Sequence, residues 1–187
     1  IELGEYHEAR VWADKALEIF RNHGDLLAAK AVAHLRDEEL DEAMQASARA
    51  VASPGSDALR WISRGEIMLK REPRRAKDCF ERALTEPAAI WFDRVAIAWV
   101  YLRHDAPAAA AEYARRAVEA QPGHIAPWLA LAMSQRDMGM LAQARESYAR
   151  CLEIEPGYDE ARLGLIRASV GPAAGLFARI RGALRRK

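Results

Sequence analysis

The sequence contains few of the residues on which metal sites and disulfide-bonded folds depend. Only two cysteines, Cys79 and Cys151, occur in 187 residues, which is too few for a disulfide framework. Both lie in stretches with helical periodicity, where a free cysteine packs as a small apolar side chain. No histidine pairs with another histidine or a cysteine at metal-ligand spacing; the five are His7, His23, His34, His104 and His124. We therefore predict no metal.

Motifs of catalysis are also missing. There is no glycine-rich phosphate loop, no Gly-x-Ser-x-Gly and no zinc-protease motif. An acidic cluster at 37–42 lies at a predicted helix start, where carboxylates interact favourably with the helix dipole and need no catalytic explanation. We therefore predict no catalytic residues and no cofactor, and a protein that is not an enzyme.

Long apolar runs, strand patterns and a strong net charge are absent too. No apolar stretch reaches the roughly 20 residues that a membrane-spanning helix needs. Valine and isoleucine are sparse and do not alternate with polar residues, so strands are not predicted. The net charge of +1 argues against a chain-wide nucleic-acid surface, and we predict no nucleic-acid partner. Alanine, leucine, glutamate and arginine dominate instead, and these residues favour helix.

The strongest signal in the sequence is an internal repeat. Two small residues, seven positions apart, recur five times at intervals of 34, 33, 34 and 34 residues. The pairs are Ala9 and Ala16, Ala43 and Ala50, Ala76 and Ala83, Ala110 and Ala117, and Ala144 and Cys151. Residues seven apart share one helical face, and small side chains there let neighbouring helices approach closely. Because one helix pair cannot bury its apolar face alone, the repeat predicts a stacked helical array.

Proline and glycine mark where the predicted helices end. Breaks occur at 53–56, 86–87, 121–123 and 155–157, while Pro73 and Pro107 stand at predicted helix starts. This register predicts a single solenoid over 1–187. It comprises a half repeat at 1–23, repeats at 24–56, 57–90, 91–124 and 125–158, and a degenerate capping repeat at 159–187. Because the chain begins at Ile1 inside a helical pattern, we interpret it as a fragment of a longer chain.

Residues 125–158 resemble a tetratricopeptide repeat. The family's characteristic positions are occupied here by Trp128, Leu131, Ala132, Gly139, Ala144, Tyr148, Cys151 and Pro156. Other copies depart from the pattern, because Arg60 and Arg94 replace the tryptophan and Arg64 replaces a small residue. The resemblance implies an all-α, right-handed superhelical solenoid of antiparallel helix pairs, with its concave face lined by the first helix of each pair. Arginine supplies 23 of the 28 basic residues, which is typical of a GC-rich bacterial source.

On that face, the resemblance implies a groove that binds a protein or peptide partner. Helical spacing predicts an apolar, aromatic surface with a basic edge, formed by Val32, Leu35, Arg36, Trp61, Met68, Val95, Trp99, Leu102, Arg103, Leu129, Met133 and Arg136. Trp61 and Trp99 would anchor an amphipathic helix or an extended apolar segment that carries acidic residues. The alternative is that both tryptophans only pack between helices. The clamp with which some relatives hold a C-terminal carboxylate is absent at the corresponding positions.

Other functions stay open on the sequence alone. One alternative is the recruiting arm of a larger bacterial enzyme, similar to a sulfotransferase or glycosyltransferase that carries such repeats. Another is a peripheral membrane assembly factor, because the tail at 175–187 is basic and amphipathic. We favour this tail as a cap of the solenoid over a membrane contact. Two further candidate occupants of the groove are a segment of the chain expected to precede Ile1 and a second copy of the chain, which would give a homo-oligomer. A cytoplasmic location is favoured, with the periplasm as the alternative.

Overall fold

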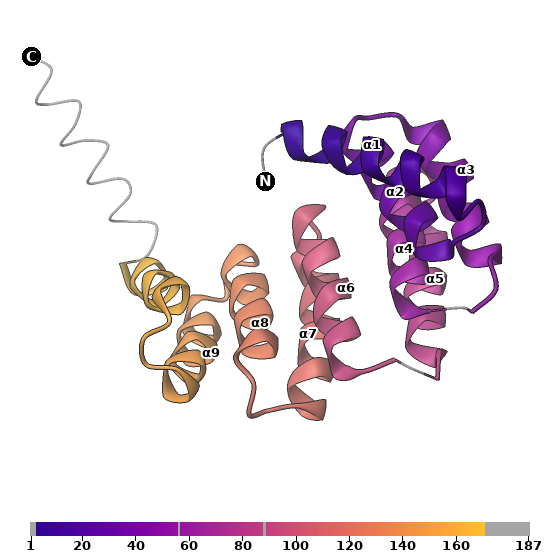
Figure 1. The fold of residues 1–187 in the computed structure, drawn as a ribbon. Helices are drawn as coiled ribbons and strands as arrows, with labels where there is room; N and C mark the ends of the chain where they lie inside the picture. The colour runs from indigo at the N-terminus through magenta and orange to yellow at the C-terminus, as the bar shows by residue number, and fades with distance from the viewer. Residues whose placement is uncertain (1–2, 56, 88, 171–187) are drawn as a thin grey trace, which may run out of the picture. The chain divides into compact units, whose positions relative to one another are not determined.

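The computed structural model describes residues 3–55, 57–87 and 89–170, and all regular structure in these ranges is helical (Figure 1). A helix at 159–170 follows the helices labelled in Figure 1, which are α1 (Leu3–Ile19), α2 (Gly24–Arg36), α3 (Leu40–Ala52), α4 (Ala58–Arg71), α5 (Pro73–Thr85), α6 (Trp91–Arg103), α7 (Pro107–Ala120), α8 (Ile125–Asp137) and α9 (Leu141–Ile154). The all-α class that the repeat predicts is confirmed. No helix in the described ranges is long and apolar enough to cross a membrane.

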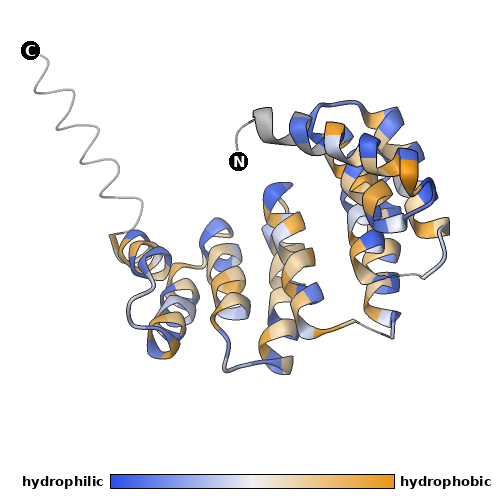
Figure 2. Ribbon diagram, viewed as in Figure 1, coloured by the Kyte–Doolittle hydropathy of each residue, from blue (hydrophilic) through white to orange (hydrophobic). Residues whose placement is uncertain are grey.

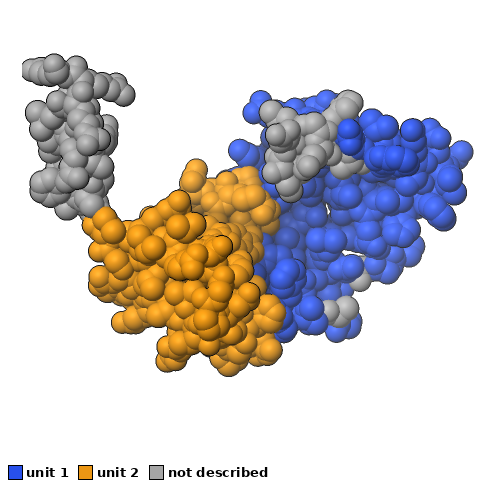
Figure 3. All heavy atoms as spheres, turned by 60° about the vertical axis from the view of Figure 1, so that its left-hand side comes forward, with its two compact units in different colours: residues 1–97 blue, residues 98–187 orange. Residues whose placement is uncertain are grey.

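The chain divides into two compact units, shown in different colours in Figure 3. Residues 1–97 contain α1 to α5 and the first half of α6. Residues 98–187 contain the second half of α6, then α7 to α9 and the helix at 159–170. The cap or membrane contact predicted at 175–187 lies outside the described residues.

The first unit is built from neighbouring helices that pack side by side. α2 packs against α3 and α4 packs against α5, while α2 and α3 both contact α4, and α1 lies against α2. The small residues predicted at the helix crossings, Ala43, Ala50, Ala76 and Ala83, have no exposed surface. A longer side chain at any of them would push two helices apart. The recurring small residues in the sequence therefore mark the positions where the helices meet.

The second unit follows the same plan. α8 packs against both α7 and α9, and the small residues Ala110, Ala117, Ala144 and Cys151 are again fully buried. Tyr148 joins the helix at 159–170 to this core, because it packs in one cluster with Ala161 and Ala168. Figure 2 shows the matching distribution of hydropathy, with apolar residues along the helices and hydrophilic residues in several connecting turns.

Local chemistry explains where several helices begin. Pro73 and Pro107 are the first residues of α5 and α7, where the missing N–H removes no helical hydrogen bond. Asp57 precedes α4, and its carboxylate accepts a hydrogen bond from the backbone N–H of Leu59 at 2.8 Å. His124 plays the same part before α8, accepting from the N–H of Ala126 at 3.3 Å through Nδ1.

Arg60 and Trp128 occupy equivalent positions and perform the same task with different chemistry. Trp128 donates its indole N–H to the carbonyl of Pro122, in the turn before its helix, at 2.8 Å. Arg60, only 6% exposed, donates through Nη1 to the carbonyl of Pro54 at 3.0 Å and through Nε to Asp25 Oδ1 at 2.8 Å. The arginine that departs from the family pattern therefore still fastens its helix to the preceding turn.

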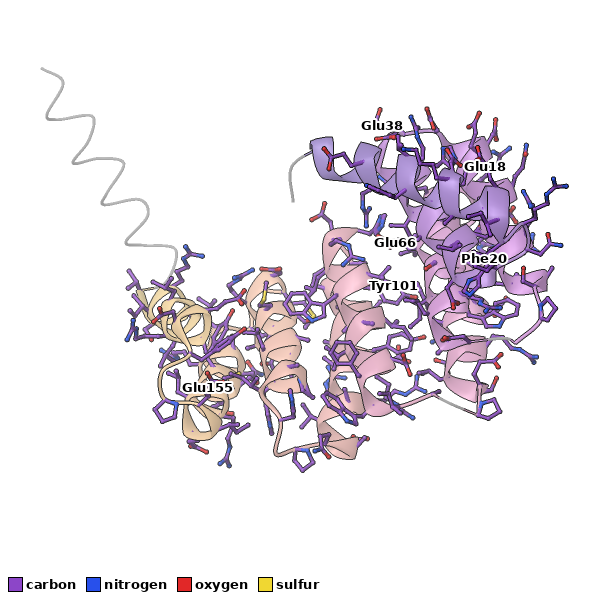
Figure 4. All side chains as sticks on the ribbon, in the orientation of Figure 1. Glu18, Phe20, Glu38, Glu66, Tyr101 and Glu155 are labelled. Carbon is purple, nitrogen blue, oxygen red and sulfur yellow. The ribbon has the colours of Figure 1, made fainter. Side chains whose placement is uncertain are left out.

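The turns inside three helix pairs share a left-handed backbone conformation. Gly139, between α8 and α9, has a φ of 76°, and the corresponding residues Glu38 and Asp105 have φ values of 62° and 52°. Figure 4 labels Glu38 at its turn between α2 and α3. Glycine adopts this conformation without steric cost, whereas an L side chain pays roughly 1–2 kcal/mol. The backbone is therefore strained at Glu38 and Asp105, and neither residue type predicts this conformation from the sequence.

We expect Asp105→Gly to stabilise the second unit by about 0.5–1 kcal/mol, because relief of backbone strain exceeds the added entropy of the unfolded glycine. Urea unfolding followed by circular dichroism measures the change. Glu146→Gly, at an exposed site inside α9, is the matched control and should cost about 1 kcal/mol. A loss of stability in Asp105→Gly would show that the aspartate side chain contributes more than its backbone costs.

Candidate functional site

A hollow of about 540 Å³ opens in the first unit between α3, α4 and α5. Two residues of α3, three of α4 and four of α5 line it: Ala48, Val51, Trp61, Arg64, Met68, Arg75, Asp78, Cys79 and Arg82. Six of its nine lining residues lie on α3 and α5, the second helices of their pairs, and the other three lie on α4, a first helix of the kind that the family resemblance implies. We call it the α3–α5 hollow.

The floor of the α3–α5 hollow comes from one face of α4. Trp61, Arg64 and Met68 are three and four residues apart, the spacing at which helical side chains lie above one another. Trp61 is half-buried, and the guanidinium carbon of Arg82 lies 5.8 Å from its ring centroid. That separation is within the range of a cation–π interaction, which holds the indole at the hollow. Met68 beneath is only 2% exposed.

Arg64 holds two helices together from inside the hollow. Its Nη1 donates to the carbonyl of Met44 at 2.7 Å and to Oγ of Ser47 at 2.8 Å, both on α3. Burial lowers the pKa of the Arg64 guanidinium, and the positive charge of Arg75 lowers it further. The side chain remains charged, since arginine stays protonated in proteins. The arginine that replaces a small residue in the repeat thus brings a positive charge into a partly buried site.

The α5 wall adds two more guanidinium groups and one carboxylate. Arg75 pairs with Glu72 at 2.9 Å, and Arg82 lies 3.8 Å from Glu86. Asp78 stands between these arginines along the helix, so the lining carries three positive charges and one negative charge. Burial raises the pKa of the Cys79 thiol, which therefore stays protonated near neutral pH and is a poor nucleophile. Burial likewise raises the pKa of Cys151, in the second unit, to about 12.

Of the residues that the sequence placed on a groove in the first unit, the structure brings Trp61 and Met68 together. The three predicted residues on α2 lie elsewhere. Leu35 is 7% exposed and packs in the core with Ile67 and neighbouring alanines. Val32 is half-buried, and Arg36 forms an ion pair with Glu66, which is 3% exposed. Leu35 and Arg36 thus take part in the packing of α2 against its neighbours.

Further along, Val95 on α6 is fully buried and belongs to the interior. In the second unit, Trp99 of α6 and Met133 of α8 are half-buried and pack against the core cluster that contains Leu129. Leu129 itself is only 4% exposed. Of the remaining predicted residues of this unit, Leu102 and Arg136 are also half-buried and Arg103 is exposed.

Sequence reasoning missed the arginines of the hollow. The predicted groove draws only on the first helix of each pair, whereas Arg75 and Arg82 lie on α5, a second helix. A signal was present, because Arg75, Asp78 and Arg82 recur at three- and four-residue spacing and must share one face of that helix. In the sequence, Arg64 stands out only as a departure from the small-residue pattern.

A family model supports the repeat. Residues 125–158 match the model of the tetratricopeptide repeat. No curated protein sequence matches the chain.

Solved structures support the fold. YrrB, described as a TPR protein with an unusual peptide-binding site, is 24% identical, with 82% of this chain and 79% of that chain covered at a TM-score of 0.50. The C-terminal part of a TPR repeat-containing protein from Cytophaga hutchinsonii is 16% identical, with 89% and 66% covered and a TM-score of 0.61. Pseudomonas aeruginosa pilF is 22% identical, with 89% and 76% covered and a TM-score of 0.60. The chain therefore carries a tetratricopeptide repeat at 125–158, and its fold is that of solved tetratricopeptide-repeat structures.

Proposed function

We propose that this protein is an interaction scaffold that binds a peptide or helix of a partner, and that the α3–α5 hollow is one of its contact sites. The observation that carries the proposal is a half-buried tryptophan, Trp61, in a hollow of about 540 Å³. Pockets that bind small ligands typically enclose about 300–1,000 Å³. Tryptophan is enriched among the few residues that dominate binding energy at protein interfaces.

The rigidity of the surroundings favours this use of Trp61. Trp61 lies on α4, which packs against both α3 and α5. Arg64 holds α4 to α3 through its hydrogen bonds, and Arg82 holds the indole of Trp61 through the cation–π contact. A preorganised surface loses little conformational entropy when a partner binds. The peptide-binding site named for YrrB belongs to that protein, and it supports only the general idea that this fold presents peptide sites.

The groove predicted on the first helices remains a proposal for a second contact, and its accessible members lie mainly in the second unit. Trp99 and Met133 are half-buried and pack against the same core cluster. Leu102 and Arg136 are also half-buried, and Arg103 is exposed. Because a scaffold with two sites gains avidity when one partner occupies both, the two surfaces are compatible within one function.

We also propose that the helix pairs are the repeats of one solenoid. α2 with α3, α4 with α5, α6 with α7, and α8 with α9 fall within 24–56, 57–90, 91–124 and 125–158, and α1 falls within 1–23. The helix at 159–170 would begin the capping repeat. It exposes Leu163, Ile166 and Val170 by 52%, 53% and 53%, on one helical face that a further element would cover.

The test is a selection of random dodecapeptides displayed on phage against the immobilised chain. We expect peptides to be enriched that bind Trp61→Ala at least about tenfold more weakly than the parent, as for an interface hot spot. Trp12→Ala is the matched control, because Trp12 is a 70% exposed tryptophan of α1 outside the hollow, and it should leave binding unchanged. Circular dichroism of each variant confirms the helix content.

Peptides that bind the parent and Trp61→Ala equally would place the contact site elsewhere. In that case Trp99→Ala separates the proposed surface of the second unit from a site that neither tryptophan serves.

A further inference from the structure

We propose that the α3–α5 hollow selects partner segments that combine acidic residues with a large apolar side chain, the carboxylates being held by Arg64, Arg75 and Arg82. The inference rests on the proposed function, since it names the chemistry of the segment that the hollow would bind. It differs from the groove predicted on the first helices, because two of the three arginines belong to the second helix α5.

Charge is the first argument. Three guanidinium groups and a single carboxylate, that of Asp78, line the hollow, while Glu72 and Glu86, which pair with Arg75 and Arg82, lie outside its lining. An acidic segment therefore complements the charge that faces the hollow, and a basic segment does not. Complementary charges steer encounter and suppress wrong partners, and like charges brought together are costly. Burial, followed by the positive charge of Arg75, lowers the pKa of the Arg64 guanidinium, and a carboxylate brought against Arg64 would act in the opposite direction.

Hydrogen-bonding capacity is the second argument. A guanidinium carries five N–H donors in a planar fork that fits both oxygens of a carboxylate. Among the described residues, both hydrogen bonds of Arg64 leave through Nη1, so Nε and Nη2 can serve a ligand. The side chain of Arg82 is 63% exposed, and its nearest carboxylate contact, Glu86, lies at a long 3.8 Å. Arg64 and Arg82 can therefore each donate hydrogen bonds to the carboxylate of a partner.

Geometry sets the spacing of the acids. Arg75 and Arg82 are seven residues apart on α5, about 10 Å along the helix axis, and Asp78 lies between them. A partner should therefore place two acidic residues about two helical turns apart, or three to four residues apart when extended, and avoid an acid opposite Asp78. Between the acids, a large apolar side chain would contact Trp61 and Val51 over the buried Met68.

The same phage selection tests this chemistry. We expect the Trp61-dependent dodecapeptides to contain Asp and Glu well above their frequency in the starting library. A synthetic copy of the best peptide should bind at least about tenfold more tightly than its counterpart with every Asp and Glu changed to Asn and Gln, as charge-assisted hydrogen bonds require. Binding of the acidic peptide should also weaken as salt is raised.

A charge-reversed variant provides the second readout. Arg75→Glu with Arg82→Glu should weaken the acidic peptide at least about tenfold, and the acidic preference should disappear from a selection repeated on this variant. Both side chains are about two-thirds exposed, at 64% and 63%, so the fold should survive. Arg150→Glu is the matched control, since Arg150 on α9 is 60% exposed and pairs with Glu153 three residues away, as Arg75 pairs with Glu72.

The outcomes separate the two proposals. One outcome is that the selected peptides need Trp61 but contain no more Asp and Glu than the starting library, and bind equally well after Asp and Glu are changed to Asn and Gln. That outcome overturns this inference and leaves the proposed function in place. Peptides indifferent to Trp61 and to both arginines, or no enrichment at all, overturn the hollow as a binding site and this inference with it. Acidic peptides that need Trp61 and lose affinity on charge reversal support both.

Discussion

Replacing Arg36 with alanine is expected to destabilise the first unit by about 3 kcal/mol, because it removes the ion pair that Arg36 makes with the buried carboxylate of Glu66. Glu66, on α4 and labelled in Figure 4, keeps only 4% of its side-chain surface, and the Arg36 side chain that covers it keeps 22%. Breaking a buried pair from one side typically costs about 3–5 kcal/mol, and the partial exposure of Arg36 places the expected effect at the lower end.

Urea unfolding of the parent, Arg36→Ala and a second variant that also carries Glu66→Leu measures this effect. The double variant should recover most of the loss, since an apolar residue of similar size no longer needs a counter-charge. Arg71→Ala is the matched control: Arg71 of α4 pairs with Asp41 of α3, and their side chains are 49% and 75% exposed. Removing that surface pair should change stability by less than about 1 kcal/mol. An equal loss in both single variants would contradict the burial argument.

This result bears on what the sequence could reveal about Arg36. Helical spacing correctly places Arg36 one turn from Val32, and so predicted it at the edge of a binding surface. Spacing cannot show that Glu66, thirty residues later, approaches the same arginine from the next helix pair. A charge at the margin of an apolar face has two readings, a contact for a partner and an internal ion pair, and only the packing of α2 against α4 distinguishes them.

The repeat itself was predictable because its chemistry is local. Ala43, Ala76, Ala110 and Ala144 have no exposed surface, as their role at the helix crossings requires. A crossing tolerates only small side chains, and the same restriction recurs wherever the same crossing is built, so it leaves a period in the sequence. Helix starts were predictable for the same reason, since the fixed φ of Pro73 and Pro107 acts within one turn.

The α3–α5 hollow could not be predicted in this way, because it depends on a substitution that breaks the repeat. The corresponding residue of a later repeat, Ala132, is small and fully buried. Arg64 instead reaches across to the backbone of Met44 and to Ser47, and it lines the hollow beside Trp61. Departures from a repeat therefore mark positions where a local function or a local defect can lie, but the sequence alone does not say which.

Phe80→Ala is expected to lower the free energy of unfolding by about 4 kcal/mol, and it should reverse the effect of a second substitution at Gly65. Phe80 of α5 is fully buried, and truncation of a buried phenylalanine to alanine typically costs about 3–5 kcal/mol. Its ring lies against Gly65 of α4, where an added Cβ would stand 2.3 Å from the Phe80 Cε1 atom. Gly65→Ala in the parent should therefore cost about 1–2 kcal/mol through overpacking, although alanine favours helix more than glycine.

In the Phe80→Ala background, the same Gly65→Ala change should stabilise the protein by about 1 kcal/mol, because the methyl group enters space that the ring has left and the helix propensity gain remains. Urea unfolding of the parent, both single variants and the double variant gives a coupling energy, expected at about 2–3 kcal/mol. Gly123→Ala, where an added Cβ meets no atom within 4 Å, is the control without a packing partner, and its effect should be the same in both backgrounds. Additive effects of Gly65→Ala and Phe80→Ala would mean that α4 and α5 do not meet through this glycine. A reversal of sign would establish that Phe80, two repeats before Tyr148, sets the closest approach of its helix pair.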